Sequence, residues 1–406
     1  MTIGPGGAGA RTPSDTPTVY LHIGTPKSGT SYLQGRLSAN VPALAEQGFH
    51  WAHPWNRQVR AARNVRALRR GHQLQPGGPW RTLASEIVDW QGSTAIISME
   101  WLVRSQPHQV EAAVASLAPA RVEVVCIARD LARTVPAAWQ EGTQTFRTWT
   151  WDDFLGAITG GRGATDPHHT EFWSQHDLVD IFRRWSTAVP LERTHLITVP
   201  PAGQPPELLW DRFCAVVGLD GSSFTSPPRD NASLGMASAQ VMRRLNVTLR
   251  EQGLSRTDYT RLGKHVLGKQ VLPERRQLEG QITLPDDVQQ WLSHRSEVML
   301  GELGQLPINV VGDVAELAVP ADATGRGLKR VSDAEMLDAA VAALAGLVAW
   351  TARREEQLIK EGAAVSTTPP ARRPPATGSL SGPAMRALRR LPLGVVRRLT
   401  RRARHR

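Results

Sequence analysis

A loop over residues 24–31 contains the side chains best suited to chemistry, in the order Gly-Thr-Pro-Lys-Ser-Gly-Thr-Ser. The apolar run before it predicts a buried strand over 18–24, and the apolar spacing after it predicts a helix over 32–44. Backbone N–H groups at such a turn, together with the positive end of the helix dipole, form an anion site. Lys27 adds a cation, so we expect a phosphate-binding loop; a plain turn with a solvated lysine is the alternative. Hydroxyl donors come from Ser28, Thr30 and Ser31.

The position of the lysine separates this loop from the loop of nucleotide triphosphatases. Their loop reads G-x-x-x-x-G-K-[ST], with the lysine after the second glycine and a hydroxyl for magnesium. Here Lys27 precedes Gly29. The segment resembles instead the 5′-phosphosulfate-binding loop of bacterial sulfotransferases that use 3′-phosphoadenylyl sulfate (PAPS). The resemblance implies that PAPS is the cosubstrate and that its binding residues are Thr25, Lys27, Ser28, Gly29, Thr30 and Ser31.

A second stretch carries the same resemblance. An apolar run that predicts a strand ends just before Arg129, where sulfotransferases carry an arginine that contacts the 3′-phosphate of PAPS. The serine that the family places eight residues further on is Ala137 here, and Thr134 or a backbone donor is expected to replace it. A surface salt bridge of Arg129 with Asp130 or Glu123 is the alternative.

Two weaker stretches resemble actinobacterial members of the family. They lie at 229–235 and 310–317, and they extend the resemblance over residues 18–320.

Transfer of a sulfuryl group also requires a base that accepts the proton of the acceptor. Glu100 follows a predicted strand and resembles the Ser-x-Glu element of bacterial relatives, while His50 and His53 lie where several relatives supply their base. A carboxylate at a helix N-terminus is the alternative for Glu100, and a surface or core histidine for the other two. Because a sulfuryl group carries less negative charge than a phosphoryl group, no metal ion is expected.

Apolar runs alternate with helical patterns, which predicts an α/β fold with a mostly parallel sheet flanked by helices. The resemblance implies that this sheet is of the P-loop-NTPase type. Later helices over 237–252 and 285–303 predict a helical C-terminal cap. Further strands are expected at 94–98, 121–128 and 194–199, and further helices at 109–117, 131–140, 176–185 and 205–219.

Composition divides the chain into four parts. Residues 1–17 are expected to be disordered, and 18–330 to form the sulfotransferase-like domain. A capping box at Ser332 begins a helix over 331–362, and 363–406 form a proline-rich linker and an arginine-rich tail.

The net charge of +11 lies entirely in this tail. Eleven arginines and no acidic residue follow Glu361, and the other 37 basic residues balance the 37 acidic residues. The tail is expected to lie on an anionic membrane or to be a disordered solubilising segment. Nucleic acid is the least favoured of its three alternatives.

The remaining features indicate the compartment. Cys126 and Cys214 lie in apolar runs, so they predict buried thiols and no disulfide. The N-terminus lacks a secretory signal, and no run of eighteen uninterrupted apolar residues predicts a membrane span. We expect a cytoplasmic protein, with the tail as a possible peripheral membrane anchor.

These observations predict a sulfotransferase that moves the sulfuryl group of PAPS to a hydroxyl or amine of a small-molecule, glycan or lipid acceptor. One alternative is a P-loop-like kinase, which the position of Lys27 disfavours. The other is a non-catalytic nucleotide-binding or membrane-associated scaffold, which Ala137 keeps open. Six tryptophans are candidates to line the acceptor pocket, with packing as the alternative: Trp51, Trp55, Trp80, Trp90, Trp149 and Trp151.

Overall fold

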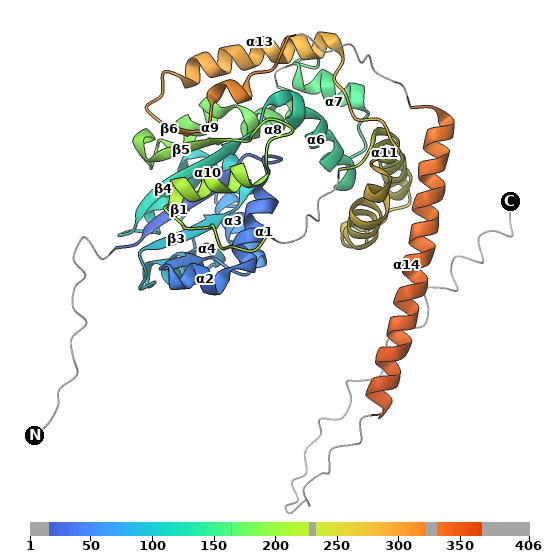
Figure 1. Ribbon diagram of the computed structural model, residues 1–406, viewed down its shortest axis with the longest axis horizontal. Helices are drawn as coiled ribbons and strands as arrows, with labels where there is room; N and C mark the ends of the chain where they lie inside the picture. The colour runs from blue at the N-terminus through green and yellow to red at the C-terminus, as the bar shows by residue number, and fades with distance from the viewer. Residues whose placement is uncertain (1–15, 164, 227–232, 322–330, 368–406) are drawn as a thin grey trace, which may run out of the picture. The chain divides into compact units, whose positions relative to one another are not determined.

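The fold is built on one open six-stranded sheet in which every neighbouring pair of strands is parallel. A computed structural model describes residues 16–163, 165–226, 233–321 and 331–367 (Figure 1). The strand order is β2-β3-β1-β4-β5-β6, and the sheet confirms the predicted α/β class. The strands are β1 (Thr18–Gly24), β2 (Phe49–Trp51), β3 (Thr94–Ser98), β4 (Arg121–Ala128), β5 (Thr194–Thr198) and β6 (Asn309–Val311).

Four of these strands were predicted and two were not. β1, β3 and β4 have the predicted bounds, and β5 ends one residue before 199. β2 and β6 have three residues each, too few to display a period along the sequence. Because β6 pairs with β5 at one edge, the C-terminal part of the domain adds a strand to the sheet and is not the purely helical cap that we predicted.

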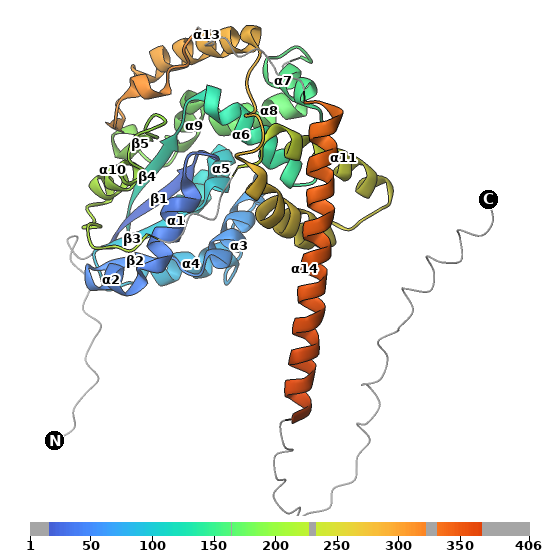
Figure 2. The ribbon, with the colours of Figure 1, turned by 45° about the vertical axis from the view of Figure 1, so that its right-hand side comes forward.

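Helices cover both faces of the sheet. The helices against it are α1 (Thr30–Ala39), α2 (Val41–Glu46), α3 (Trp55–Arg66), α4 (Pro79–Val88), α5 (Pro107–Ala115), α6 (Leu131–Gln144), α9 (Leu178–Trp185) and α10 (Glu207–Val217). On one face, Val19 and Leu21 of β1 are fully buried in a cluster with residues of α3, α4, α5, α6 and α9. On the other face, Val125 and Ile127 of β4 pack with α1, α2 and α10 (Figure 2). Strands buried on both sides explain the continuous apolar runs.

Two predicted helices differ from their expected form. The segment 32–44 contains two helices, because α1 ends before Asn40 and Pro42 lies in the first turn of α2. α6 continues past its predicted end at 140 to Gln144 and accommodates Pro136 within it. The remaining elements are α7 (Trp151–Ile158), α8 (Pro167–His176), α11 (Met236–Glu251), α12 (Arg256–Tyr259), α13 (Asp286–Leu303), and the 3₁₀ helices η2 (Glu100–Arg104), η3 (Leu191–Arg193), η5 (Leu272–Arg275) and η6 (Val314–Leu317).

One segment after α12 is an extended π-helix, η4 (Thr260–Val271). π-Helices are rare and occur mostly as single-turn bulges within α-helices, and those bulges are frequent at functional sites. Two hydrogen bonds tie it and the preceding turn to the end of α6. The amide of Gln144 donates to the carbonyl of Gly268 (3.1 Å), and the hydroxyl of Tyr259 donates to the carbonyl of Thr143 (2.9 Å).

The last described helix is α14 (Asp333–Thr367), which extends beyond its predicted end at 362. Its capping box is confirmed: the N–H of Glu335 donates to the hydroxyl of Ser332 (3.2 Å), and the carboxylate of Glu335 accepts from the N–H of Ser332 (2.8 Å). The chain divides within this helix into two compact units, 1–351 and 352–406.

By length and composition alone, α14 could cross a membrane. Its segment Asp333–Lys360 has a mean hydropathy of 1.4 over its most apolar window. This differs from the prediction, which considered only uninterrupted apolar runs, whereas here alanines are interspersed with polar residues. The arginine-rich tail after 367 and the N-terminal segment 1–15 lie outside the described residues, as does most of the weak resemblance at 229–235.

Candidate functional site

The loop between β1 and α1 has the backbone shape of an anion site. Lys27 and Gly29 have φ angles of 67° and 89°, both in the left-handed region. A Cβ atom at Gly29 would lie 2.6 Å from Cδ2 of Leu209, so this position requires glycine. α1 begins at Thr30 without a side-chain cap. The N–H groups of its first turn therefore favour an anion, with the helix dipole behind them.

The loop hydroxyls have different roles. Thr25 donates its hydroxyl to the carbonyl of Ile127 (3.1 Å), and the hydroxyl of Ser28 donates to the carbonyl of Thr25. The resemblance assigns both side chains to cosubstrate binding; here Thr25 holds the loop against β4, and Ser28 bonds within the loop. The hydroxyl of Thr30 is buried and has no hydrogen-bond partner among the described residues, and Ser31 is exposed. Thr30 and Ser31 are therefore the hydroxyls that a ligand could use.

The loop lies where the strand order of the sheet reverses. β1 lies between β3 and β4, so the chain adds strands first on one side of β1 and then on the other. Open α/β sheets bind ligands at such a point, outside the carboxyl ends of the strands. Glu100 follows β3 and Arg129 follows β4, and both strands run parallel to β1. The structure thus brings the Lys27 loop, Glu100 and Arg129 to one edge of the sheet.

Glu100 is directly beside the loop. A Cβ atom at Gly24 would lie 3.4 Å from Cα of Glu100. The Oε2 atom of Glu100 is buried and has no hydrogen-bond partner among the described residues. Burial raises the pKa of this carboxyl group above 4.5, against the opposing effects of a hydrogen bond with Gln34 and the charge of Lys27. A carboxylate with a raised pKa is a stronger proton acceptor.

His50 does not lie at the edge of the sheet that carries the loop. It pairs with Ala95, and Ala95 pairs with Val19 near the start of β1, whereas the loop follows the end of that strand. The imidazole lies 3.3 Å from the carboxylate of Glu86 and packs on Trp90, with 5.2 Å between ring centroids. Burial lowers its pKa. These contacts give His50 a packing role remote from Lys27.

His53 is exposed and follows the edge strand β2, which β3 separates from β1. Its carbonyl accepts a hydrogen bond from Arg57 (3.3 Å). No hydrogen bond or ion pair within 16–163, 165–226, 233–321 or 331–367 joins His53 to the loop. The structure therefore brings Glu100, and neither of the two histidines, to the loop.

Arg129 has an unused guanidinium atom. Its Nε atom is buried and has no hydrogen-bond partner among the described residues. The two carboxylates considered as alternative partners are occupied by other arginines: Arg133 pairs with Asp130, and Arg121 pairs with Glu123 (2.6 Å). The surface salt bridge proposed as the alternative is therefore not present, and burial lowers the pKa of the Arg129 guanidinium. An anion could accept the hydrogen bond that this Nε–H does not make with the described residues.

Thr134 supports Arg129 through the backbone. Its hydroxyl donates to the carbonyl of Arg129 (3.3 Å), so it helps to position the arginine. A small cavity of about 10 Å³ lies beside Arg129, Thr25 and His176. It has room for about one water molecule, so it is too small to be a nucleotide site.

A second group of charges surrounds Lys27. The carboxylate of Glu141, on α6, lies 2.7 Å from Lys27, 3.0 Å from Lys264 and 3.9 Å from Lys269. Burial alone would raise the pKa of Glu141, but the charges of the three lysines outweigh it and lower that pKa to about 2. All four side chains are half-buried. We refer to Lys27, Lys264 and Lys269 as the lysine cluster.

Sequence reasoning missed Lys264, Lys269 and Glu141, although two signals were present. Only five of the 48 lysine and arginine residues are lysines, and three of those five belong to the cluster. In addition, the segment Leu262-Gly-Lys-His-Val266 is followed at once by Leu267-Gly-Lys-Gln-Val271, a repeat of five residues.

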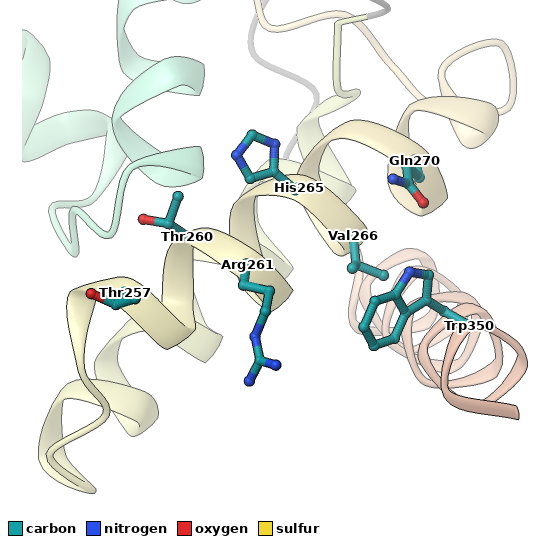
Figure 3. A pocket seen from close by; sticks show the side chains of 7 residues that line it. All are labelled: Thr257, Thr260, Arg261, His265, Val266, Gln270 and Trp350. Carbon is teal, nitrogen blue, oxygen red and sulfur yellow. The ribbon is translucent and has the colours of Figure 1, made fainter. Parts of the chain in front are cut away.

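A larger cavity lies elsewhere and is lined by none of the predicted site residues. It has a volume of about 510 Å³ and lies on η4, where Trp350 of α14 faces Val266 (Figure 3). None of the six candidate tryptophans lines either described cavity. Trp51, Trp80 and Trp151 are buried in the core, which favours the packing alternative for them.

No group of three or more His, Cys, Asp or Glu side chains among the described residues could hold a metal ion. No protein-family model, no curated protein and no solved structure matches this chain. Four features lie together where the strand order of the parallel sheet reverses, and together they suit a bound anion. They are an uncapped helix start, a lysine, an arginine whose Nε atom has no partner among the described residues, and a carboxylate of raised pKa.

Proposed function

We propose that this chain is a PAPS-dependent sulfotransferase with a P-loop-NTPase-like sheet, acting on a hydroxyl or amine of a small-molecule, glycan or lipid acceptor. One observation carries the proposal: two side chains suited to holding anions, Lys27 and Arg129, follow the carboxyl ends of the adjacent strands β1 and β4. A nucleoside bisphosphate with phosphates at both its 5′ and 3′ positions matches two such side chains.

The residues of the loop fit the 5′ end of this cosubstrate. Lys27 and the N–H groups at the start of α1 offer positive charge where the leaving phosphate gains negative charge. Arg129 fits the 3′-phosphate, because its half-buried guanidinium has a buried Nε–H without a partner among the described residues.

Glu100 fits the part of the base. In the reaction the bond between sulfur and the 5′-phosphate oxygen breaks, and that oxygen keeps the electron pair. A bond between sulfur and the acceptor oxygen or nitrogen forms, and Glu100 receives the acceptor proton. Its position beside Gly24 and its raised pKa favour this role over His50 and His53. The reaction needs no metal ion to balance charge, since Lys27 supplies the cation.

The test is release of 3′-phosphoadenosine 5′-phosphate from PAPS in the presence of small-molecule, glycan and lipid acceptors. We expect release that depends on one acceptor class, with sulfate recovered on that acceptor. Binding of 3′-phosphoadenosine 5′-phosphate without transfer to any class would identify the non-catalytic scaffold. Transfer of a phosphoryl group from ATP would identify the kinase.

A further inference from the structure

We infer that Lys27, Lys264 and Lys269 form a site for a doubly charged oxyanion and that Glu141 occupies this site in the ligand-free chain. The ligand class is a phosphate or phosphosulfate group with two negative charges. Its identification as the 5′ end of PAPS rests on the proposed function, whereas the lysine cluster itself does not.

Charge balance is the first argument. The three ammonium groups carry three positive charges, and the carboxylate of Glu141 lies within 2.7–3.9 Å of all of them. One carboxylate thus leaves two positive charges uncompensated in a half-buried place, where screening by water is reduced. Glu100 also interacts electrostatically with Lys27, and burial raises the pKa of its carboxyl group. A dianion in the place of Glu141 would compensate two of the three charges, one more than the carboxylate does.

The helix type is the second argument. A π-helix bonds each residue to the fifth one along, so residues five apart lie on the same face. The five-residue repeat in η4 therefore places Lys264 and Lys269 one turn apart, both toward Glu141. An α-helix would place residues five apart well off a common face. The repeat and the helix type together direct two of the five lysines of the chain toward the carboxylate of Glu141.

Packing holds this lysine face close to the loop. Gly268 lets η4 approach α6, since a Cβ atom there would lie 3.3 Å from Cγ of Gln144. The amide of Gln144 donates to the carbonyl of Gly268 (3.1 Å), three residues from Glu141 along α6. The lysines of η4 and the anion loop therefore face each other across the end of one helix, with the Glu141 side chain between them.

Glu141 acts in this arrangement as an internal competitor. A carboxylate is an oxyanion with one charge, and it makes the hydrogen bonds that a ligand oxygen would make: 2.7 Å to Lys27 and 3.0 Å to Lys264. A ligand must displace it. Binding of the ligand then releases the side chain of Glu141 and keeps all three lysines.

The experiment measures dissociation constants by calorimetry for two probes, 3′-phosphoadenosine 5′-phosphate and inorganic pyrophosphate. Glu141→Gln keeps the shape and removes the competing charge, so we expect both probes to bind about tenfold more tightly. Replacing Lys264 and Lys269 together by Gln should weaken both about tenfold or more, and replacing both by Arg should keep most of the affinity. Lys360→Gln is the matched control, because Lys360 is exposed and pairs with Glu356 on α14.

Unchanged or weaker binding by Glu141→Gln overturns the inference, as does wild-type affinity in the double Gln variant. Should Glu141→Gln fail to fold, Glu141→Asp withdraws the carboxylate by one methylene, and unchanged affinity for pyrophosphate in that variant overturns it equally. The inference is also overturned if neither wild type nor Glu141→Gln binds pyrophosphate. A different result would show that only the proposed function is wrong. In that case the affinities of the variants for pyrophosphate change as predicted, but the nucleoside bisphosphate binds no better than adenosine 5′-phosphate.

Discussion

Among single residues, the proposed sulfuryl transfer depends on Lys27. This half-buried side chain lies in the loop between β1 and α1, and its ammonium group faces Glu141 at 2.7 Å. We predict that Lys27→Ala removes sulfuryl transfer while the protein still folds. Loss of one such donor costs about 2.7–4 kcal/mol of transition-state stabilisation. The measurement is turnover beside thermal unfolding, and a variant that melts normally with wild-type turnover contradicts the assignment.

Glu100 gives the second prediction at this scale. Burial raises the pKa of its carboxyl group, and only the deprotonated form accepts a proton, so turnover should fall as the pH is lowered through a value above 4.5. Glu100→Gln should depress turnover strongly, remove this limb of the pH profile and leave the affinity for the nucleoside bisphosphate unchanged. The matched variants His50→Ala and His53→Ala should keep most of the activity. If His50→Ala or His53→Ala abolished turnover, that histidine would replace Glu100 as the favoured base.

Residue types along the chain predicted some of the site and not the rest. Lys27, Arg129 and Glu100 each follow a predicted strand, and parallel strands bring such residues to one edge. His50 and His53 could not be placed, because β2 has only three residues and gives no register in the sequence. Lys264 and Lys269 reach the loop through η4, and no helix rule based on a period of 3.6 residues predicts that approach.

At the scale of elements, the turn from β1 into α1 depends on a glycine. Gly29 has a φ angle of 89°, and a Cβ atom there would lie 2.6 Å from Leu209 of α10. We predict that Gly29→Ala lowers the free energy of unfolding by about 1–3 kcal/mol, because the left-handed conformation and the close contact both oppose a side chain. It should also weaken binding of anions at the loop.

Gly71→Ala is the control for this prediction, measured by urea denaturation of both variants. Gly71 has a φ angle of 80° but no atom near the position of a Cβ. The two variants share the conformational cost, so the difference between them isolates the contact with Leu209. Equal free energies of unfolding for the two variants would show that this contact does not constrain the turn.

The elements also show how far sequence patterns predict a fold. The buried strands β1, β3 and β4 were predicted with their bounds, because a strand covered on both faces is a continuous apolar run. The edge strands β2 and β6 were not predicted, since each has three residues and its pairing depends on neighbours far away in the sequence. The helix over 32–44 was predicted as one, although Pro42 favours a new start there.

At the scale of the whole chain, charge is distributed unevenly. All of the net charge of +11 follows Glu361, so attraction to an anionic surface must come from that end of the chain. We predict that deleting residues 363–406 reduces sedimentation with vesicles that contain anionic lipid and leaves transfer to a soluble acceptor unchanged. Binding of the full chain should weaken with added salt, as screened electrostatics requires. Vesicles of neutral lipid are the control, and equal binding with and without the tail contradicts the prediction.

We propose that Lys27 and Arg129, at the ends of β1 and β4, hold the two phosphates of one nucleoside bisphosphate. Calorimetric titration of wild type and Arg129→Ala with 3′-phosphoadenosine 5′-phosphate and with adenosine 5′-phosphate tests it most directly. The control is Arg121→Ala, which removes an arginine from the opposite end of β4, where it pairs with Glu123. We predict that Arg129→Ala weakens the affinity for the bisphosphate by about tenfold or more. The affinity for adenosine 5′-phosphate should stay nearly unchanged, because only the bisphosphate has a 3′-phosphate. Equal losses for the two nucleotides, or no preference of wild type for the bisphosphate, would contradict the account.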